Sequence, residues 1–139
     1  MTDQNRKPKI LVIDDEADLL AILSSMAEEF LDAETQIAKN GKVALEILEE
    51  KTFDVITTDV QMPIMDGFTF FKELRARGNK TPVIFLTANG THEMAADVLA
   101  LGGFDYIDKP VNHKEWIALL KEAVKVSKKM QQLNKKASA

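Results

Sequence analysis

The sequence predicts an α/β fold built on a doubly wound, five-stranded parallel sheet with the strand order 2-1-3-4-5. Short apolar runs, typical of strands that are buried on both faces, alternate along the chain with longer segments. In those segments apolar residues recur every three or four positions, as on one face of a helix. This alternation favours a parallel sheet covered by helices on both faces, and right-handed crossovers leave few other strand orders.

The expected elements follow one another regularly and end at polar or turn-forming residues. The strands are the runs 10–13, 34–38, 53–58, 82–86 and 104–107. The amphipathic helices lie within 19–30, 43–48, 68–74, 94–101 and 116–124. The second strand is the weakest in apolar character, and Asn40-Gly41 breaks it. Gly102-Gly103 closes the fourth helix, and the fifth is expected to continue into a Lys- and Gln-rich tail.

Length and composition indicate one compact domain. The chain has 139 residues, of which 45% are hydrophobic, so a sizeable core can be buried. We expect a flexible segment over 1–8, a folded domain over 9–126, and a helical extension and tail over 127–139. No apolar run approaches the ~20 residues of a membrane span, and the first nine residues include no apolar signal sequence. We therefore expect a cytoplasmic protein without membrane contact.

The residue counts exclude or disfavour several classes of function. There are 18 Lys and Arg against 22 Asp and Glu, a net charge of −4, which argues against direct nucleic-acid binding. The absence of Cys excludes disulfides, thiolate nucleophiles and zinc sites built on Cys. The two histidines, His92 and His113, are too few for a multi-His metal site.

Polar side chains stand where the expected strands end. In open parallel sheets, ligands bind beyond the carboxyl ends of the strands where the strand order reverses, which is here between the first and third strands. Asp14 and Asp15 follow the first strand, and Asp59 follows the third. The fourth and fifth strands bring Thr87 and Lys109 to the same edge. The topology therefore predicts one constellation from residues that are far apart in the sequence.

Three carboxylates that meet in a cleft repel one another and need positive charge nearby. A divalent cation with oxygen ligands, Mg²⁺ or as a substitute Mn²⁺, together with the Lys109 ammonium, makes the site neutral. Carboxylates accept phosphoryl groups, and phosphoryl transfer needs mainly positioning and charge neutralisation. Asp59, at the end of the central strand, is the candidate nucleophile. Because transfer makes the site more negative, the small Thr87 hydroxyl is expected to move toward the new oxygens.

Each of these residues also has an ordinary explanation. Asp14-Asp15 suits a helix N-terminus, and Asp59 suits the entry to a loop. Thr87 suits a strand end or a helix cap, and Lys109 is typical of a solvated surface. None of these explanations accounts for the gathering of polar groups at one edge. Pro110 either ends the fifth strand or follows a cis bond that aims Lys109 into the cleft.

Five short motifs, in order between Lys9 and about Lys125, match one family. They are Ile13-Asp14-Asp15-Glu16, Asn40-Gly41 before Ala44-Leu45, Asp59-Val60-Gln61-Met62-Pro63-Ile64-Met65-Asp66-Gly67, Leu86-Thr87-Ala88 and Asp105-Tyr106-Ile107-Asp108-Lys109-Pro110. The chain resembles the receiver domain of two-component response regulators, which has a flavodoxin-like (βα)5 fold like that of the chemotaxis regulator. The order and spacing of all five motifs make the resemblance highly specific.

The resemblance implies a phosphoprotein with a bound metal. Asp59 would be the phosphoacceptor, and the donor would be a phosphohistidine on a sensor histidine kinase or a histidine phosphotransfer protein. Mg²⁺ would be bound by Asp15, Asp59 and the backbone carbonyl of Gln61, with Asp14 acting through water. A receiver catalyses its own phosphorylation and dephosphorylation, so it is not a conventional enzyme.

The resemblance also implies a switch. Thr87 and Lys109 would contact the phosphoryl oxygens, and Tyr106, otherwise a core or edge aromatic, matches the position of a switch residue. Phosphorylation would bias an output surface made by the fourth helix, the fifth strand and the fifth helix, through which a homodimer can also form. Gln61 and Asn89 flank the expected path of the hydrolytic water, and our hypothesis is that they tune the lifetime of the phosphorylated state.

Several functions remain open on the sequence alone. Within the family, the chain is a stand-alone regulator, a phosphorelay intermediate, or a receiver excised from a longer regulator with a DNA-binding or enzymatic output domain. A phosphohydrolase of the haloacid-dehalogenase type would need an Asp-x-Asp motif, whereas Asp14 and Asp15 are adjacent. An FMN binder would need a phosphate loop rich in Ser, Thr and Gly after the first strand, where Asp14-Asp15-Glu16 would repel the phosphate.

Overall fold

The computed structural model describes residues 6–88 and 92–138, and it confirms the expected α/β fold. Strands and helices alternate through the chain. They are β1 (Lys9–Ile13), α1 (Ala17–Leu31), β2 (Glu34–Ala38), α2 (Gly41–Glu50), β3 (Val55–Asp59), α3 (Gly67–Ala76), β4 (Val83–Thr87), α4 (His92–Ala100), β5 (Asp105–Asp108) and α5 (His113–Ser138). The strands form one parallel sheet in the predicted order β2-β1-β3-β4-β5.

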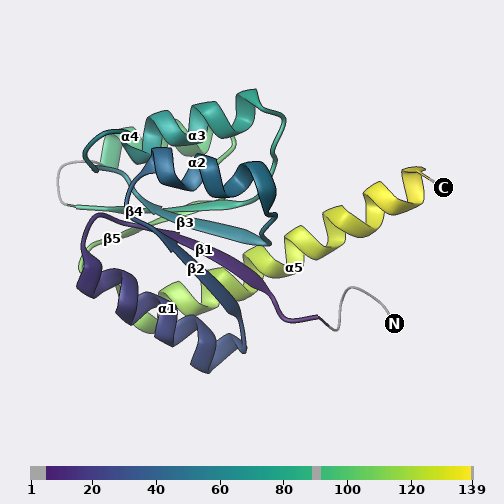
Figure 1. Ribbon diagram of the computed structural model, residues 1–139, viewed down its shortest axis with the longest axis horizontal. Helices are drawn as coiled ribbons and strands as arrows, with labels where there is room; N and C mark the ends of the chain where they lie inside the picture. Colours follow the sequence, from purple (N-terminus) through teal and green to yellow (C-terminus); the bar gives the residue numbers. More distant parts are fainter. Residues whose placement is uncertain (1–5, 89–91, 139) are drawn as a thin grey trace.

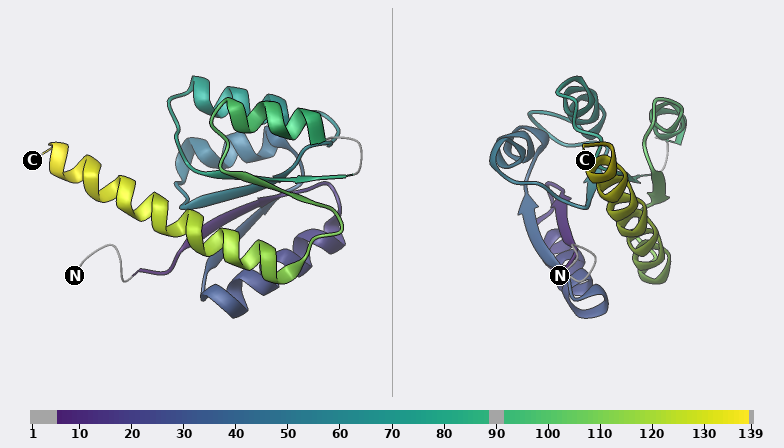
Figure 2. Two further views of the ribbon diagram at one scale, coloured as in Figure 1. Left: turned by 180° about the vertical axis from the view of Figure 1, so that it is seen from behind. Right: turned by 90° about the vertical axis from the view of Figure 1, so that its right-hand side faces the viewer.

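Helices cover both faces of this sheet (Figure 1). The helices α1 and α5 lie on one face and α2, α3 and α4 on the other, and the turned views in Figure 2 separate the same two layers. Each face has its own apolar cluster. The cluster on the α1 and α5 face contains the fully buried Trp116, and the cluster on the opposite face contains Phe70 and Phe85. The core therefore consists of two layers with the sheet between them.

The apolar runs of the sequence mark the central strands. Every residue of β3 and β4 is buried, as are the last four residues of β1. The strand β2 lies at the edge of the sheet, where Ile37 is 49% exposed. This edge position explains why the second strand has the weakest apolar pattern, because only a strand enclosed on both faces needs a continuous apolar run.

Two element boundaries differ from the sequence expectation. The strand β5 covers Asp105–Asp108, one residue later than expected, although the Phe104 N–H already donates to the carbonyl oxygen of Val83 at 2.9 Å. The helix α5 begins at His113 rather than near Trp116. The reason is an Asn cap, because Oδ1 of Asn112 accepts a hydrogen bond from the Glu115 N–H at 3.0 Å.

The register of the sheet aligns the carboxyl ends of its strands. Ile13 of β1 lies opposite Thr58 of β3, and Asp59 lies opposite Leu86 of β4. At the next strand, the Lys109 N–H donates to the carbonyl oxygen of Thr87 at 2.7 Å. The residues at the ends of β1, β3, β4 and β5 are thereby brought together at the carboxyl end of the sheet.

Near the amino ends of the strands, one buried carboxylate is bound by residues from both the N-terminal and the C-terminal part of the described chain. The Asp54 side chain is fully buried, and the Arg6 guanidinium contacts both of its oxygens at 2.7 Å. The Lys9 N–H donates to Asp54 at 2.8 Å, and the amide of Gln131, on α5, donates at 3.2 Å. Burial opposes ionisation of Asp54, but the Arg6 hydrogen bonds and the other donors outweigh it and hold the pKa below its ordinary value. Residues on both sides of the span 9–126 are therefore bound to Asp54, the residue directly before β3.

The helix α5 is the longest element, and its C-terminal part projects beyond the sheet (Figure 1). Its N-terminal part is fixed by Trp116, whose ring N–H donates to the hydroxyl of Thr57 at 3.3 Å inside the core. None of the helices in the described ranges combines the length with the apolar character that crossing a bilayer requires.

Candidate functional site

Charged side chains from three strand ends meet at the carboxyl edge of the sheet. Asp14 follows β1, Asp59 is the last residue of β3, and Lys109 follows β5. The Lys109 Nζ lies 3.1 Å from Oδ2 of Asp14 and 3.1 Å from Oδ2 of Asp59. The side chain of Asp14 is fully buried, that of Asp59 is 8% exposed, and that of Lys109 is 15% exposed. The topology thus brings these residues into direct contact, rather than leaving Lys109 in solvent.

A third carboxylate completes a cluster of oxygen ligands. Asp14, Asp15 and Asp59 each offer an oxygen, and the three oxygens lie within 4.8 Å of one another. Oxygens that share one Mg²⁺ at about 2.1 Å lie at most about 4.2 Å apart, so small side-chain shifts bring this set to one ion. Asp15 is exposed, which leaves the cluster open to solvent on its side. The residues could therefore hold a divalent cation, and a set made only of oxygens fits Mg²⁺ or Mn²⁺ better than zinc.

The site carries more negative than positive charge. Burial raises the pKa of both Asp14 and Asp59, and the negative charge of Asp14 raises the pKa of Asp59 further. Lys109 lowers both pKa values, but not enough to cancel the effect of burial. Burial also disfavours the Lys109 ammonium, but the hydrogen bond to Asp14 and the charge of Asp59 outweigh it, so the pKa of Lys109 is raised. One ammonium therefore does not compensate the buried carboxylates, and additional positive charge is stabilising here.

Sequence reasoning missed Glu16 as a contact of this site. Its Oε1 lies 3.5 Å from the Lys109 Nζ, and its backbone N–H donates to Oδ1 of Asp14 at 2.9 Å. The Glu16 side chain is 64% exposed, so solvent screens its attraction to Lys109. In the sequence, the only indication of this contact was the position of Glu16 directly after Asp14-Asp15.

Sequence reasoning also missed the part that Gly67 plays in shaping the site. Gly67 begins α3, and its N–H donates to the carbonyl oxygen of Val60 at 2.8 Å. A Cβ atom at this position would lie 2.2 Å from the carbonyl oxygen of Asp59, which is far inside van der Waals contact. The absence of a side chain lets α3 approach the backbone of Asp59 and close the loop between them.

Gly67→Ala is expected to lower the free energy of unfolding by about 2 kcal/mol or more, because the backbone of Asp59 must move to admit a methyl group. Urea unfolding followed by circular dichroism measures the loss. Gly103→Ala is the control, since its Cβ would meet the ring edge of Phe85 at 2.9 Å rather than a backbone atom, and a smaller loss is expected. Equal losses in the two variants would contradict this explanation.

The remaining predicted residues lie around the cluster. Thr87 is buried at the end of β4, and its hydroxyl donates to the carbonyl oxygen of Ala88 at 3.2 Å. Tyr106 is half-buried on β5 and packs against the apolar cluster on the α2, α3 and α4 face. Gln61 is exposed, and its backbone N–H donates to Oδ1 of Asp59 at a long 3.4 Å. Asn89 lies outside the described residues.

Two hollows at opposite edges of the sheet differ in character. Beside the site, the bond between Lys109 and Pro110 is cis. A hollow of about 660 Å³ opens there with a mainly apolar lining, made by Glu16, Leu19, Ile22, Leu23, Ala88, Lys109, Pro110, Val111 and His113.

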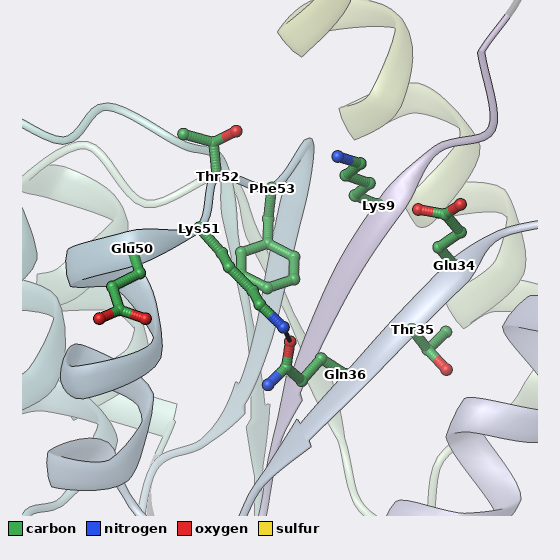
Figure 3. Close-up of a pocket in the computed structure, with 8 residues that line it drawn as sticks. All are labelled: Lys9, Glu34, Thr35, Gln36, Glu50, Lys51, Thr52 and Phe53. Atoms are coloured by element: carbon green, nitrogen blue, oxygen red, sulfur yellow. Dashed lines mark hydrogen bonds between the residues drawn. The ribbon is translucent and has the colours of Figure 1, made fainter.

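A hollow of about 440 Å³ lies near the amino ends of β1 and β2, where Figure 3 shows the Lys51 ammonium directed at the Gln36 amide. The hydrogen bond between these side chains is 3.0 Å long, and the charges of two lysines and two glutamates balance around them, so nothing there resembles the acidic cluster.

Comparison with known families decides what kind of domain this is. The sequence matches the family model of the response regulator receiver domain over residues 10–121. The chain belongs to the response regulator receiver domain family. Such receivers are signalling modules of two-component systems rather than conventional enzymes, and they interact with histidine kinases or other phosphoryl donors.

Individual relatives agree with this assignment. The regulatory protein AtoC of Escherichia coli K12 is 37% identical over 126 residues, which are 91% of this receiver and 26% of AtoC. The DNA-binding transcriptional regulator NtrC of the same strain is 34% identical over 124 residues, 88% of this receiver and 26% of NtrC. The solved receiver domain of the Francisella response regulator 1452 superposes with a TM-score of 0.81 at 34% identity, covering 87% of this receiver and 99% of that chain. The receiver therefore spans about a quarter of the length of AtoC and NtrC.

Proposed function

We propose that this receiver accepts a phosphoryl group on Asp59 from a phosphohistidine, with Mg²⁺ bound by Asp15, Asp59 and the backbone carbonyl of Gln61, and by Asp14 through water. The observation that carries the proposal is the contact between Lys109 Nζ and Asp59 Oδ2 at 3.1 Å, at the mouth of the acidic cluster. A nearly buried carboxylate beside an ammonium is a nucleophile with a built-in partner for the incoming phosphoryl oxygens. Membership of the receiver family supports the same assignment.

The transfer replaces a nitrogen–phosphorus bond with an oxygen–phosphorus bond. A carboxylate oxygen of Asp59 attacks the phosphorus, and the bond to the donor imidazole breaks. The bonding electrons leave with the imidazole nitrogen, which then takes a proton from solvent. In the later hydrolysis, water attacks the same phosphorus, loses a proton to solvent, and releases inorganic phosphate and the Asp59 carboxylate. Mg²⁺, when bound, neutralises charge on the phosphoryl oxygens.

The residues of this chain position and then detect the phosphoryl group. The Lys109 ammonium donates to a phosphoryl oxygen, which stabilises the charge that transfer adds to the site. The Thr87 hydroxyl, which donates a hydrogen bond to the Ala88 carbonyl oxygen in this structure, turns to donate to a second phosphoryl oxygen. Tyr106 responds to that movement and biases the surface formed by α4, β5 and α5. Gln61 and Asn89 tune the lifetime of the phosphorylated state.

The partners follow from this chemistry. The donor is a sensor histidine kinase or a histidine phosphotransfer protein, and the mainly apolar hollow beside Lys109 offers such a protein a surface to lie against. The output is a homodimer formed through α4, β5 and α5, or an attached output domain like those of the transcriptional regulators to which the chain is similar. A phosphorelay intermediate is the alternative role. We propose the cytoplasm as the compartment, because the DNA-binding regulators among the relatives have their target there.

Incubation with acetyl phosphate and Mg²⁺ is expected to add one phosphoryl group that is stable in acid and lost in base. Intact-mass spectrometry detects the gain, and borohydride reduction followed by peptide mass spectrometry locates the acyl phosphate at Asp59. EDTA is expected to abolish labelling. Asp15→Asn should raise the Mg²⁺ concentration required, because one carboxylate ligand is lost. The control Asp18→Asn, on an exposed residue in the first turn of α1, should behave as wild type. Labelling at another residue, or labelling that ignores Mg²⁺, would refute the proposal.

A further inference from the structure

A hollow near the amino ends of β4 and β5 has a lining that is cationic and apolar, with no acidic side chain among the described residues. Its volume is about 470 Å³. The lining comes from α3 and the loop after it, the turn before β5, and the middle of α5, which passes these strand ends in the left view of Figure 2. The residues are Arg75, Lys80, Pro82, Gly102, Gly103, Phe104, Val126 and Met130. This composition is unexpected in a chain with a net charge of −4.

Arg75 is a half-buried guanidinium without a carboxylate partner in the ranges 6–88 and 92–138. Its Nη1 donates to the carbonyl oxygens of Asn79 at 3.0 Å and Thr81 at 2.9 Å, and its Nη2 donates to that of Gly102 at 3.4 Å. The guanidinium also lies over the Phe71 ring, 4.6 Å from its centre. These partners are neutral, and burial lowers the pKa of Arg75. The guanidinium is therefore fixed in position while its charge stays uncompensated.

A second cation and an apolar wall complete the hollow. Lys80, on the loop between α3 and β4, is exposed and forms no ion pair within the described part of the chain. On α5, Val126 is 40% exposed and Met130 is half-buried. The volume lies within the range of about 300–1,000 Å³ that is usual for small-molecule sites. Two cations beside apolar side chains fit a small anion that is carried on an apolar body.

The α5 wall of the hollow is held in place by residues far away in the sequence. The Gln131 amide, directly after Met130, donates to Asp54 at 3.2 Å. Arg6 donates to the side-chain oxygen of Gln131 at 3.0 Å, and the Lys128 Nζ donates to the carbonyl oxygen of Arg6 at 3.2 Å. These contacts fix the part of α5 that carries Met130, so the wall is formed before any ligand arrives. A preformed site loses less conformational entropy when it binds.

We propose that this hollow binds a small amphipathic carboxylate. The carboxylate pairs with Lys80 and with the Nε–H of Arg75, which has no acceptor among the residues that the structure describes. The apolar chain lies against Val126 and Met130 and removes their side chains from water. The proposed phosphorylation uses no residue of this hollow, so the site is independent of the proposed function.

The probe is sodium octanoate, added to the full chain below its micelle concentration while NMR follows the backbone amides. The signals of Gly102, Gly103 and Phe104 are expected to shift and to saturate, with a dissociation constant of about 1 mM. Two matched compounds separate the parts of the ligand. Acetate keeps the carboxylate without the chain, and 1-octanol keeps the chain without the charge. Both should bind at least about tenfold more weakly than octanoate.

Variants locate the binding without disturbing Arg75, whose contacts join two loops. Lys80→Met should weaken octanoate binding about fivefold, because one exposed cation is lost. Val126→Asp should weaken it by more than about tenfold, since a like charge replaces an apolar contact. The controls are Lys42→Met, on an exposed lysine of α2, and Ile37→Asp, on a half-exposed residue of the edge strand β2. Both controls should bind octanoate as wild type does, and circular dichroism should show all four variants folded.

Three results would each overturn the proposed site. The first is shifts that do not saturate or that avoid residues 102–104, because no site is then present in this hollow. The second is equal binding of octanoate and 1-octanol, which would show that the cations take no part. The third is unchanged octanoate affinity in both Lys80→Met and Val126→Asp, which would place the ligand elsewhere.

Discussion

Asp59→Asn is expected to abolish phosphoryl labelling and to stabilise the folded protein at neutral pH. The amide is not a nucleophile for phosphoryl transfer, so no mass gain should appear with acetyl phosphate and Mg²⁺. The stability gain follows from charge, because Asp59 is nearly buried and lies close to the fully buried Asp14. Removing one of two crowded carboxylates leaves Lys109 to compensate the other at 3.1 Å.

The pH dependence of stability gives a second measurement on the same variant. Burial raises the pKa of Asp59 above its ordinary value of 3.8. Between 3.8 and the raised value, the folded state therefore binds more protons than the unfolded chain, and stability falls as pH rises. Asp59→Asn should flatten this fall, and the slope that remains belongs in part to Asp14, whose pKa is also raised. Urea unfolding at a series of pH values from about 4 to 7 measures the slope.

Asp97→Asn serves as the control for both measurements, because this carboxylate is exposed on α4. It should be labelled like wild type and keep the wild-type pH profile. A labelled Asp59→Asn variant would contradict the phosphoacceptor assignment. A variant that is less stable than wild type at pH 7 would contradict the charge argument.

Lys109→Met is expected to lower the free energy of unfolding by about 3 kcal/mol and to slow phosphorylation by orders of magnitude. Methionine keeps most of the side-chain volume but leaves Asp14 and Asp59 in a nearly buried site without their cation. The stability loss should be largest at neutral pH and shrink as acid protonates the two carboxylates. The labelling rate falls because the ammonium that neutralises the incoming phosphoryl oxygens is gone.

A double-mutant cycle isolates the contact between Lys109 and Asp59. The variant Lys109→Met/Asp59→Asn should regain part of the stability that Lys109→Met loses, and it should remain unlabelled. Lys42→Met, on an exposed lysine of α2, is the control and should change neither stability nor labelling appreciably. A loss in Lys109→Met no greater than in Lys42→Met would show that Lys109 does not hold the site together.

Most of the fold and the centre of the site could be predicted from the sequence because both depend on where the buried, apolar strands end. A parallel strand enclosed on both faces must be apolar throughout, so a polar residue after the run marks its end and hence the sheet edge. Asp14, Asp59 and Lys109 are placed at one edge by this rule alone, and the structure puts them in contact.

The features that the sequence did not reveal depend on distances between separate segments. The need for Gly67 arises from the approach of α3 to the Asp59 backbone, which no local pattern records. The backbone of Ile64, with φ at 72°, runs against the preference of this residue type, since β-branched residues favour extended backbone. The early start of α5 depends on one cap, Asn112, that precedes the apolar pattern.

The buried Asp54 sets limits on how far this protein can be trimmed. Its carboxylate is bound by Arg6 near one end of the chain and by Gln131 near the other, so both flanks act as parts of the folded unit. A truncation to residues 9–126, natural to choose from the apolar pattern, would delete both partners and leave an uncompensated anion in the interior. Fusions, tags and domain swaps are better joined before residue 6 and after residue 131.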